Sequence, residues 1–366
     1  MFYVTIFTET FLYLCLAFLA GSFLIRLLPA TSHIRVNISS NLQLAAVWGI
    51  ALFAFVPLIQ LITHIAGRST LGSAFEDVLL SFRIGNAWLF LFIICILFSV
   101  YIAYIKNTDS KQAAWVGMVF TGFAAFGVGW ASHAGSFEGF LGVFTHGVHI
   151  LAVSAWIGTL LMASWFVPKS MDWQRFVTSY HPFALICFVI VVLSGILLAQ
   201  FTVDFRQYDE ALLVSYGQSL FLKQLFIIPL VIYAIFNGIW MKRRLQADAS
   251  LQARPWIRVE FFIILFILLL TGIMNEQSPP LYMESLIEHS GYAPILNMFY
   301  DGTMDGAAIS LALDGSVFFF IALALACIAG SIYIFKAKKH PALSWLTSLL
   351  FVVMGYFAFI QSIVIN

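Results

Sequence analysis

Ten uninterrupted apolar runs constrain this chain more than any other feature of its sequence. A helix that crosses a bilayer needs about 20 predominantly apolar residues, because the hydrocarbon core is about 30 Å thick. Runs of this length lie at about residues 2–28, 42–66, 84–105, 113–131, 140–167, 182–203, 219–241, 256–274, 314–335 and 342–365. They are continuous and do not alternate between polar and apolar residues, which excludes a membrane β-barrel. The sequence therefore predicts an all-α polytopic membrane helix bundle of about ten transmembrane helices.

The overall composition agrees with this prediction. With 62% hydrophobic and 10% charged residues, the chain is too apolar for an ordinary soluble domain. Its formal net charge is only +1, which gives no reason to expect binding to nucleic acid. We expect the lipid bilayer to be its partner, and no nucleic acid.

Basic residues predict the orientation of the bundle, because short cytoplasmic loops retain an excess of Lys and Arg. Assigning the connections alternately to the two sides places on one side Arg26, Arg35, Lys106, Lys111, Lys169, Arg175, Lys242, Arg243, Arg244, Arg254, Arg258, Lys336, Lys338 and Lys339. Only Arg68, Arg83 and Arg206 fall on the other side. This imbalance predicts that both termini are extracytoplasmic. The first run has no basic segment before it and no small-residue cleavage site, so we expect a retained span.

Three histidines and one carboxylate occur within 17 residues, where the fourth apolar run ends and the fifth begins. They are His133, Glu138, His146 and His149. A histidine within a membrane span is costly, so its presence there suggests a function. His146 and His149 are three apart in a predicted helix and share a face, and the short connection after His133 would bring that residue alongside. His64, near the outer end of the second run, is expected at the same membrane level.

Such a cluster is compatible with three roles. Imidazole binds copper, zinc, iron and nickel as the neutral base, and Glu138 would attract a cation, so His64, His133, Glu138, His146 and His149 form a candidate metal site. A b-type haem is the alternative, because it needs two histidines on facing helices, and His133 or His64 could serve with His149. In the third role each histidine donates to a backbone carbonyl of a neighbouring helix and binds nothing.

The remaining segments carry weaker signals. His181 is expected at the membrane interface, because Pro182 fits the first turn of a helix that would open the sixth span. The external segment at about residues 276–313 holds three methionines among acids, and a connecting or partner-contacting loop is favoured over copper capture. The chain has no Walker loop, no dinucleotide fingerprint, no Gly-x-Ser-x-Gly and no His-Glu-x-x-His motif, so we do not expect an enzyme.

Four short segments of the chain form a pattern in their order and spacing. They are Ser132-His133-Ala134, the stretch from His149 through Trp156-Ile157-Gly158 to Leu160, Leu222-Lys223-Gln224-Leu225, and Val259-Glu260 leading to Ser278-Pro279-Pro280. In order and spacing, over about residues 115–280, they resemble the copper resistance protein D family of bacterial membrane proteins. By position His133 and His149 match histidines of the family's pattern, whereas His146 and His64 rest on geometry alone. The family commonly has Trp-Leu-Gly-Gly where this chain has Trp156-Ile157-Gly158-Thr159.

The resemblance implies transport of copper across the bacterial cytoplasmic membrane, usually inward. Members of the family often act with a periplasmic copper-binding partner, and the resemblance implies either a separate partner protein or none. On this basis we expect three transmembrane helices in residues 1–112 and a family-like core of five in residues 113–280. An extracytoplasmic loop in residues 281–313 and two further helices in residues 314–366 complete the expected division.

Overall fold

The structure is a computed structural model that describes residues 2–29, 36, 38–105, 110–168, 170–248, 251–281, 283–300, 309–337 and 340–365. Its regular structure is almost entirely helical, which confirms the predicted all-α class. Ten helices in these ranges are long and apolar enough to cross a membrane, as predicted. Of the residues used to predict orientation, Arg35, Lys106, Lys169, Lys338 and Lys339 lie outside the described residues. The orientation of the termini and the four-part division of the chain stay predictions.

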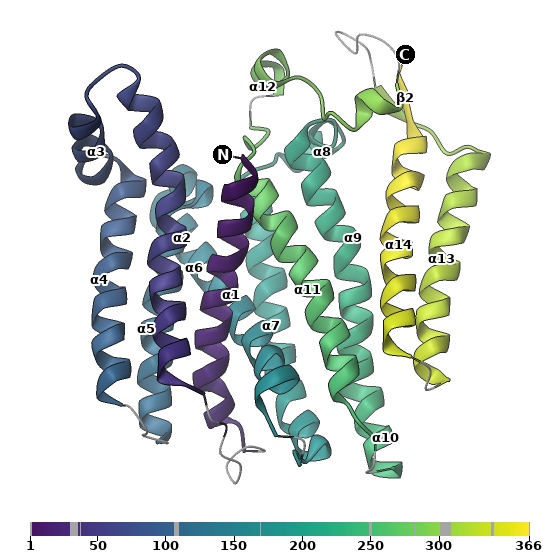
Figure 1. The fold of residues 1–366 in the computed structure, drawn as a ribbon. Coiled ribbons are helices and arrows are strands. Elements are labelled where there is room, and N and C mark those ends of the chain that lie inside the picture. The colour runs from purple at the N-terminus through teal and green to yellow at the C-terminus, as the bar shows by residue number, and fades with distance from the viewer. Residues whose placement is uncertain are drawn as a thin grey trace. The chain divides into compact units, whose positions relative to one another are not determined.

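The helices follow the apolar runs along the chain (Figure 1). The first seven are α1 (Phe2–Leu27), α2 (Ser40–Ala66), α3 (Leu71–Leu80), α4 (Arg83–Tyr104), α5 (Lys111–Ala131), α6 (His133–Leu161) and α7 (Trp173–Gln200). The next five are α8 (Tyr208–Ala211), α9 (Ser215–Ile235), α10 (Met241–Ala247), α11 (Arg254–Asn275) and α12 (Met283–Ser290). The last two are α13 (Gly315–Lys336) and α14 (Pro341–Ser362). Five-residue π-helices at Met162–Phe166 and Phe236–Trp240 extend α6 and α9.

The start of α7 differs from the sequence-based expectation. The helix begins at Trp173, so Pro182 and His181 lie inside it, and the prediction that Pro182 opens the helix is wrong. The interfacial position of His181 stays a prediction. Asp172 caps the helix, its carboxylate accepting a hydrogen bond from the Arg175 backbone N–H at 2.9 Å. The first two turns form although they are not continuously apolar, because Trp173 and neighbours on the same face are buried.

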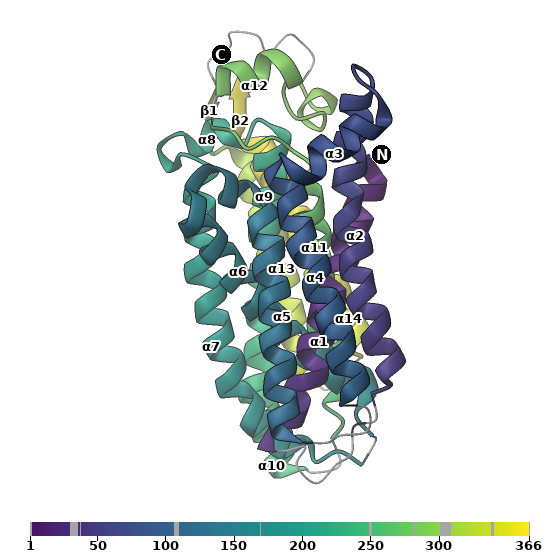
Figure 2. The same ribbon diagram turned by 90° about the vertical axis from the view of Figure 1, so that its left-hand side faces the viewer.

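The chain divides into two compact units. The first comprises Met1–Thr202 and Gly238–Arg258, and the second comprises Val203–Asn237 and Val259–Asn366. In the first unit α1 and α6 are the most buried spans and pack against each other. Around them, α2 and α5 contact α1, while α5 and α7 contact α6, so that α6 and α7 lie side by side (Figure 2). This arrangement places α6, which carries most of the candidate ligands, in the interior of its unit.

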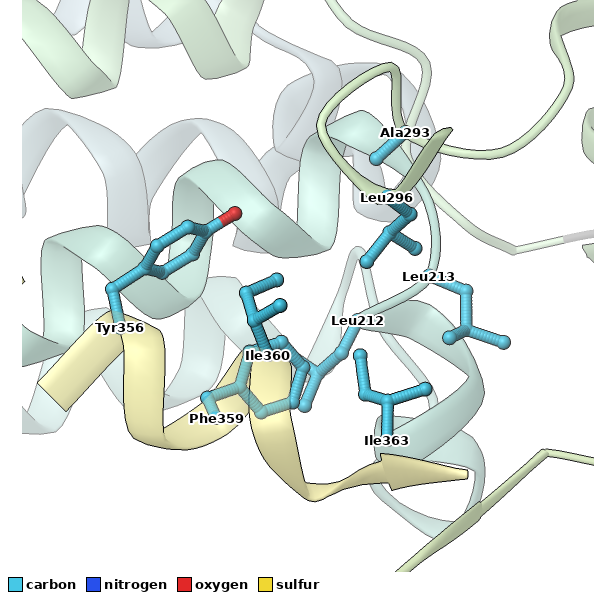
Figure 3. Close-up of a cluster of buried hydrophobic side chains, with 8 residues drawn as sticks. All are labelled: Leu212, Leu213, Ala293, Leu296, Tyr356, Phe359, Ile360 and Ile363. Carbon is cyan, nitrogen blue, oxygen red and sulfur yellow. The ribbon is translucent and has the colours of Figure 1, made fainter. Parts of the chain in front are cut away.

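The second unit is built on the hairpin of α13 and α14. The strands β1 (Ile309–Leu311) and β2 (Ile363–Ile365) pair antiparallel, with Ile309 opposite Ile365. A buried cluster lies near this sheet, and Figure 3 shows its members Leu212, Leu213, Ala293, Leu296, Tyr356, Phe359, Ile360 and Ile363. The backbone N–H of Ala293 donates to the carbonyl of Leu213 at 2.8 Å. The described part of the predicted loop 281–313 therefore contains a helix and a strand and is tied to its unit by packing.

Candidate functional site

The first turns of α6 carry two of the predicted ligands. Ser132 ends α5 and begins α6, because its hydroxyl donates to the Gly129 carbonyl at 2.7 Å and accepts from the Gly135 N–H at 3.2 Å. His133 is therefore the first residue of α6, and it does not belong to the preceding helix. Gly139 then breaks the helix with φ +55° and ψ −129°, a conformation that glycine adopts without a steric penalty. The kink separates His133 and Glu138 from the longer part of α6 that carries His146 and His149.

Three of the predicted ligands lie on the surface of the first unit. His133 and Glu138 are exposed before the kink, and the ring of His133 stacks on that of Phe137, with centroids 6.2 Å apart. His64 is exposed near the end of α2. These side chains are accessible to an ion at the surface of the first unit.

His149 lies deeper, half-buried in the contact between α6 and α7. Its Nδ1 is 2.9 Å from the hydroxyl oxygen of Ser194. Next to it, Gly195 leaves room for the ring, since a β-carbon there would be 3.5 Å from Cε1 of His149. The Ser194 hydroxyl is also 2.6 Å from the Ile190 carbonyl, an acceptor for its single proton. In the tautomer that this arrangement favours, Nδ1–H donates to the Ser194 oxygen and the lone pair of the neutral imidazole is on Nε2.

His146 is half-buried one turn before His149 on α6. Among the described residues, no group of three or more His, Cys, Asp and Glu side chains lies close enough together to hold a metal ion. The five-residue ligand set predicted from the sequence thus stays a prediction. No contact within the described ranges supports the haem alternative.

The structure adds residues below His149 to which sequence reasoning gave no role in ion binding. Trp156, two turns further along α6, is 4% exposed, and its ring meets Phe188 of α7 edge-on, with centroids 5.9 Å apart. Tyr180 of α7 donates from its hydroxyl to the carbonyl of Trp156 at 3.2 Å. Trp156, Tyr180 and Phe188 were difficult to single out from the sequence, because aromatic residues at helical spacing usually indicate ordinary packing.

Two arginines of the first unit hold the backbone at helix ends. Arg83 donates from Nε to the Trp130 carbonyl at 3.1 Å, and its Nη2 would be 2.5 Å from a β-carbon on Gly135. At the other end, Arg258 donates from Nε and Nη2 to the Ser164 carbonyl at 3.2 and 3.0 Å. Ser164 belongs to the π-helix Met162–Phe166. A cation at the carbonyl end of a helix opposes the partial negative charge there, so Arg83 stabilises the end of α5 and Arg258 the π-helical end of α6.

The fold and these contacts define a polytopic helical membrane protein with a histidine between two of its spans. Residues 174–274 match the model of the family described as Copper resistance protein D. The match supports a relationship of this segment to a family of copper-related membrane proteins. No curated protein and no solved structure matches the chain. The matched segment includes Ser194 and His181 of α7 and ends before the last residue of α11, whereas the histidines of α6 precede it.

Proposed function

We propose that the protein carries copper ions inward across the bacterial cytoplasmic membrane and that His149 is the central ligand. The observation that supports this most is the 2.9 Å hydrogen bond between Nδ1 of His149 and the Ser194 hydroxyl, which holds the imidazole ring in one orientation where α6 meets α7. A metal-ligating histidine usually donates its other ring N–H in this way, which fixes the tautomer and the ring orientation. The family match to copper resistance protein D supports copper as the ion.

In this proposal the predicted ligands act in the order of their burial. His133, Glu138 and His64 are exposed and receive the ion, with a separate copper-binding protein outside the membrane as its source. His146 and His149 are half-buried and hold it next. Gly139, at the kink between the two groups, is the point where the first turns of α6 can move relative to the rest of the helix.

The membrane potential supplies a sufficient driving force. One positive charge that moves inward gains about 2.3 kcal/mol per 100 mV. This corresponds to a concentration ratio of roughly 50-fold, since each 1.4 kcal/mol is a factor of ten. Uptake of a monovalent copper ion therefore needs no nucleotide hydrolysis.

The test is copper binding by the purified protein with and without His149→Ala. We expect the wild-type protein to bind copper and the variant to lose at least about tenfold in affinity, the size expected when a ligand contact is removed. His289→Ala is the matched control, because His289 is exposed on α12 and bonds to the Ser285 carbonyl. Equal copper affinity of the wild-type and His149→Ala proteins would contradict the proposal. A Soret band in the wild-type protein that is lost in His149→Ala would show haem binding in its place.

A further inference from the structure

The contact between α6 and α7 continues below His149 as a line of polar and aromatic groups. His149 and Trp156 are seven residues apart on α6, about two turns, and therefore face α7 together. Both contact α7, His149 through Ser194 and Trp156 through Phe188. The indole Nε1–H of Trp156 is buried and has no hydrogen-bond acceptor among the described residues. A buried donor in apolar surroundings is costly unless it meets a partner, so the contact is suited to water or a partly hydrated ion at this point.

His181 lies on α7 seven residues before Phe188, about two turns, and therefore on the same face of the helix. It follows Tyr180, whose hydroxyl donates to the Trp156 carbonyl. Its ring rests on the backbone of Gly238, where a β-carbon would be 2.0 Å from Nδ1. Only a glycine admits the imidazole there, and Gly238 is part of the π-helix Phe236–Trp240. Such π-helical segments occur frequently at functional sites.

The surroundings of His181 fit a ligand that binds weakly. The half-buried ring makes no hydrogen bond within the described part of the chain, although it lies inside a membrane span. An imidazole that no protein donor engages can coordinate a cation through a ring nitrogen. A half-buried ring of this kind can take up an ion and release it readily.

The geometry points to the α6–α7 contact as the inward copper route. The ion passes from His149 past Trp156 to His181, which is the last ligand on the path. The inference rests on the proposed function and adds the path and its last ligand. Ser194, beside His149, and His181 are 13 residues apart on α7, about 20 Å along the helix axis. This spacing covers most of a hydrocarbon core about 30 Å thick. The face of an indole ring attracts cations, so Trp156 lowers the cost of the passage between the two histidines.

The experiment compares copper uptake and copper binding for variants of His181 in proteoliposomes, with cuprous ion as the probe. We expect His181→Ala to lower the initial rate of uptake at least about tenfold, because the loss of a ligand raises the activation barrier for passage of the ion. The affinity of the site at His149 for copper should stay unchanged. His181→Cys should restore most of the rate, because a thiolate is a good ligand for cuprous ion. His181→Asn, which is close to histidine in size and a poor copper ligand, should remain slow. His289→Ala is the control and should transport at the wild-type rate.

Two results would overturn this inference while leaving the proposed function standing. One is a His181→Ala protein that transports at the wild-type rate. The other is equal uptake by the Cys and Asn variants, since a purely structural role would not depend on the ability to bind copper. These two variants also decide the question if His181→Ala fails to fold. Failure of the proposed function looks different, because the wild-type protein would then take up no copper, or His149→Ala would bind it normally.

Discussion

Gly21 of α1 and Gly158 of α6 touch backbone to backbone. A β-carbon on Gly21 would be 2.1 Å from the carbonyl oxygen of Gly158, and one on Gly158 would be 2.0 Å from the carbonyl oxygen of Ala17. Small residues allow helices to approach this closely within a membrane, where dispersion contacts between helices replace the hydrophobic driving force. The contact joins the two most buried spans of the first unit and fixes α6 beside α1.

Replacing one of these glycines should destabilise the protein. We expect Gly158→Ala to lower the free energy of unfolding by about 1–3 kcal/mol, because its methyl group meets backbone that cannot move without separating the helices. Thermal unfolding in detergent measures the change. Gly330→Ala is the control in another span, since its β-carbon would lie 3.8 Å from Thr347 Cγ2, an ordinary contact. Alanine there should be neutral or stabilising by up to about 1 kcal/mol. Equal effects of the two substitutions would contradict a close contact at Gly158.

Removing the hydroxyl of Ser194 should weaken copper binding without removing a ligand. Ser194→Ala leaves Nδ1 of His149 without its acceptor, so the tautomer and orientation of the ring are no longer fixed. Loss of such an outer partner usually costs about 10–100-fold in metal affinity, which a copper titration detects. Ser179→Ala is the matched control, because Ser179 on the same helix also donates to a backbone carbonyl, that of Arg175, at 3.0 Å. A normal affinity in Ser194→Ala would show that the hydrogen bond has no part in binding.

The guanidinium group of Arg258 should stabilise the π-helical end of α6. Arg258→Lys keeps the positive charge but loses the pair of hydrogen bonds that Nε and Nη2 donate to the Ser164 carbonyl. Hydrogen bonds from charged groups contribute about 1.5–3 kcal/mol each, so we expect a loss of about 1–2 kcal/mol in thermal unfolding. Arg243→Lys, at an exposed residue of α10, should have no measurable effect. If both lysine variants melt like the wild-type protein, the contact does not stabilise the fold.

Acid should weaken the start of α13 through Asp314. Its carboxylate accepts from the Ser316 hydroxyl at 2.7 Å and the Val317 N–H at 2.9 Å, and these bonds hold the pKa of Asp314 below its ordinary value of 3.8. Because the folded pKa is the lower one, this stabilisation is complete above the unfolded pKa and is lost as pH falls through the folded pKa. Asp314→Asn still caps the helix but does not titrate.

The two proteins should therefore melt differently at neutral pH and converge in acid. The melting temperature measured between pH 7 and pH 3 should show the wild-type protein losing its small advantage over Asp314→Asn as the carboxyl is protonated. A difference between the two proteins that stays constant over this range would show that the charge of Asp314 does not act on α13.

Hydropathy was sufficient to predict the class of fold and the approximate place of nearly every span. Each residue of a span must satisfy its backbone within the helix, so a long apolar run in lipid has few alternatives. The run at residues 42–66, for example, became α2 at Ser40–Ala66. Hydropathy did not predict the start of α7, because the first turns of this helix are amphipathic. A capping Asp172 followed by Trp173, Phe176, Val177 and Tyr180 at helical spacing was the signal that could have predicted the longer helix.

The candidate site was less predictable. Spacing along one helix was enough to predict that His146 and His149 share a face. It could not indicate which helix that face would meet, because contacts with α7 depend on how the spans pack. The π-helices and the contact of His181 with Gly238 carry no recognised sequence signal, so the role of Gly238 became apparent only in the folded chain.

The sequence by itself determined that this protein is a bundle of about ten membrane helices, because the cost of exposing backbone and polar groups to lipid acts on each segment separately. Its residues also pointed to copper, through the histidines and the family resemblance. Only the tertiary structure decided that Ser194 orients His149, that His133 begins α6, and that His181 lies within a span on Gly238. Those relationships depend on packing between helices distant in sequence, and in lipid that packing is set by the detailed fit of small and polar residues rather than by hydropathy.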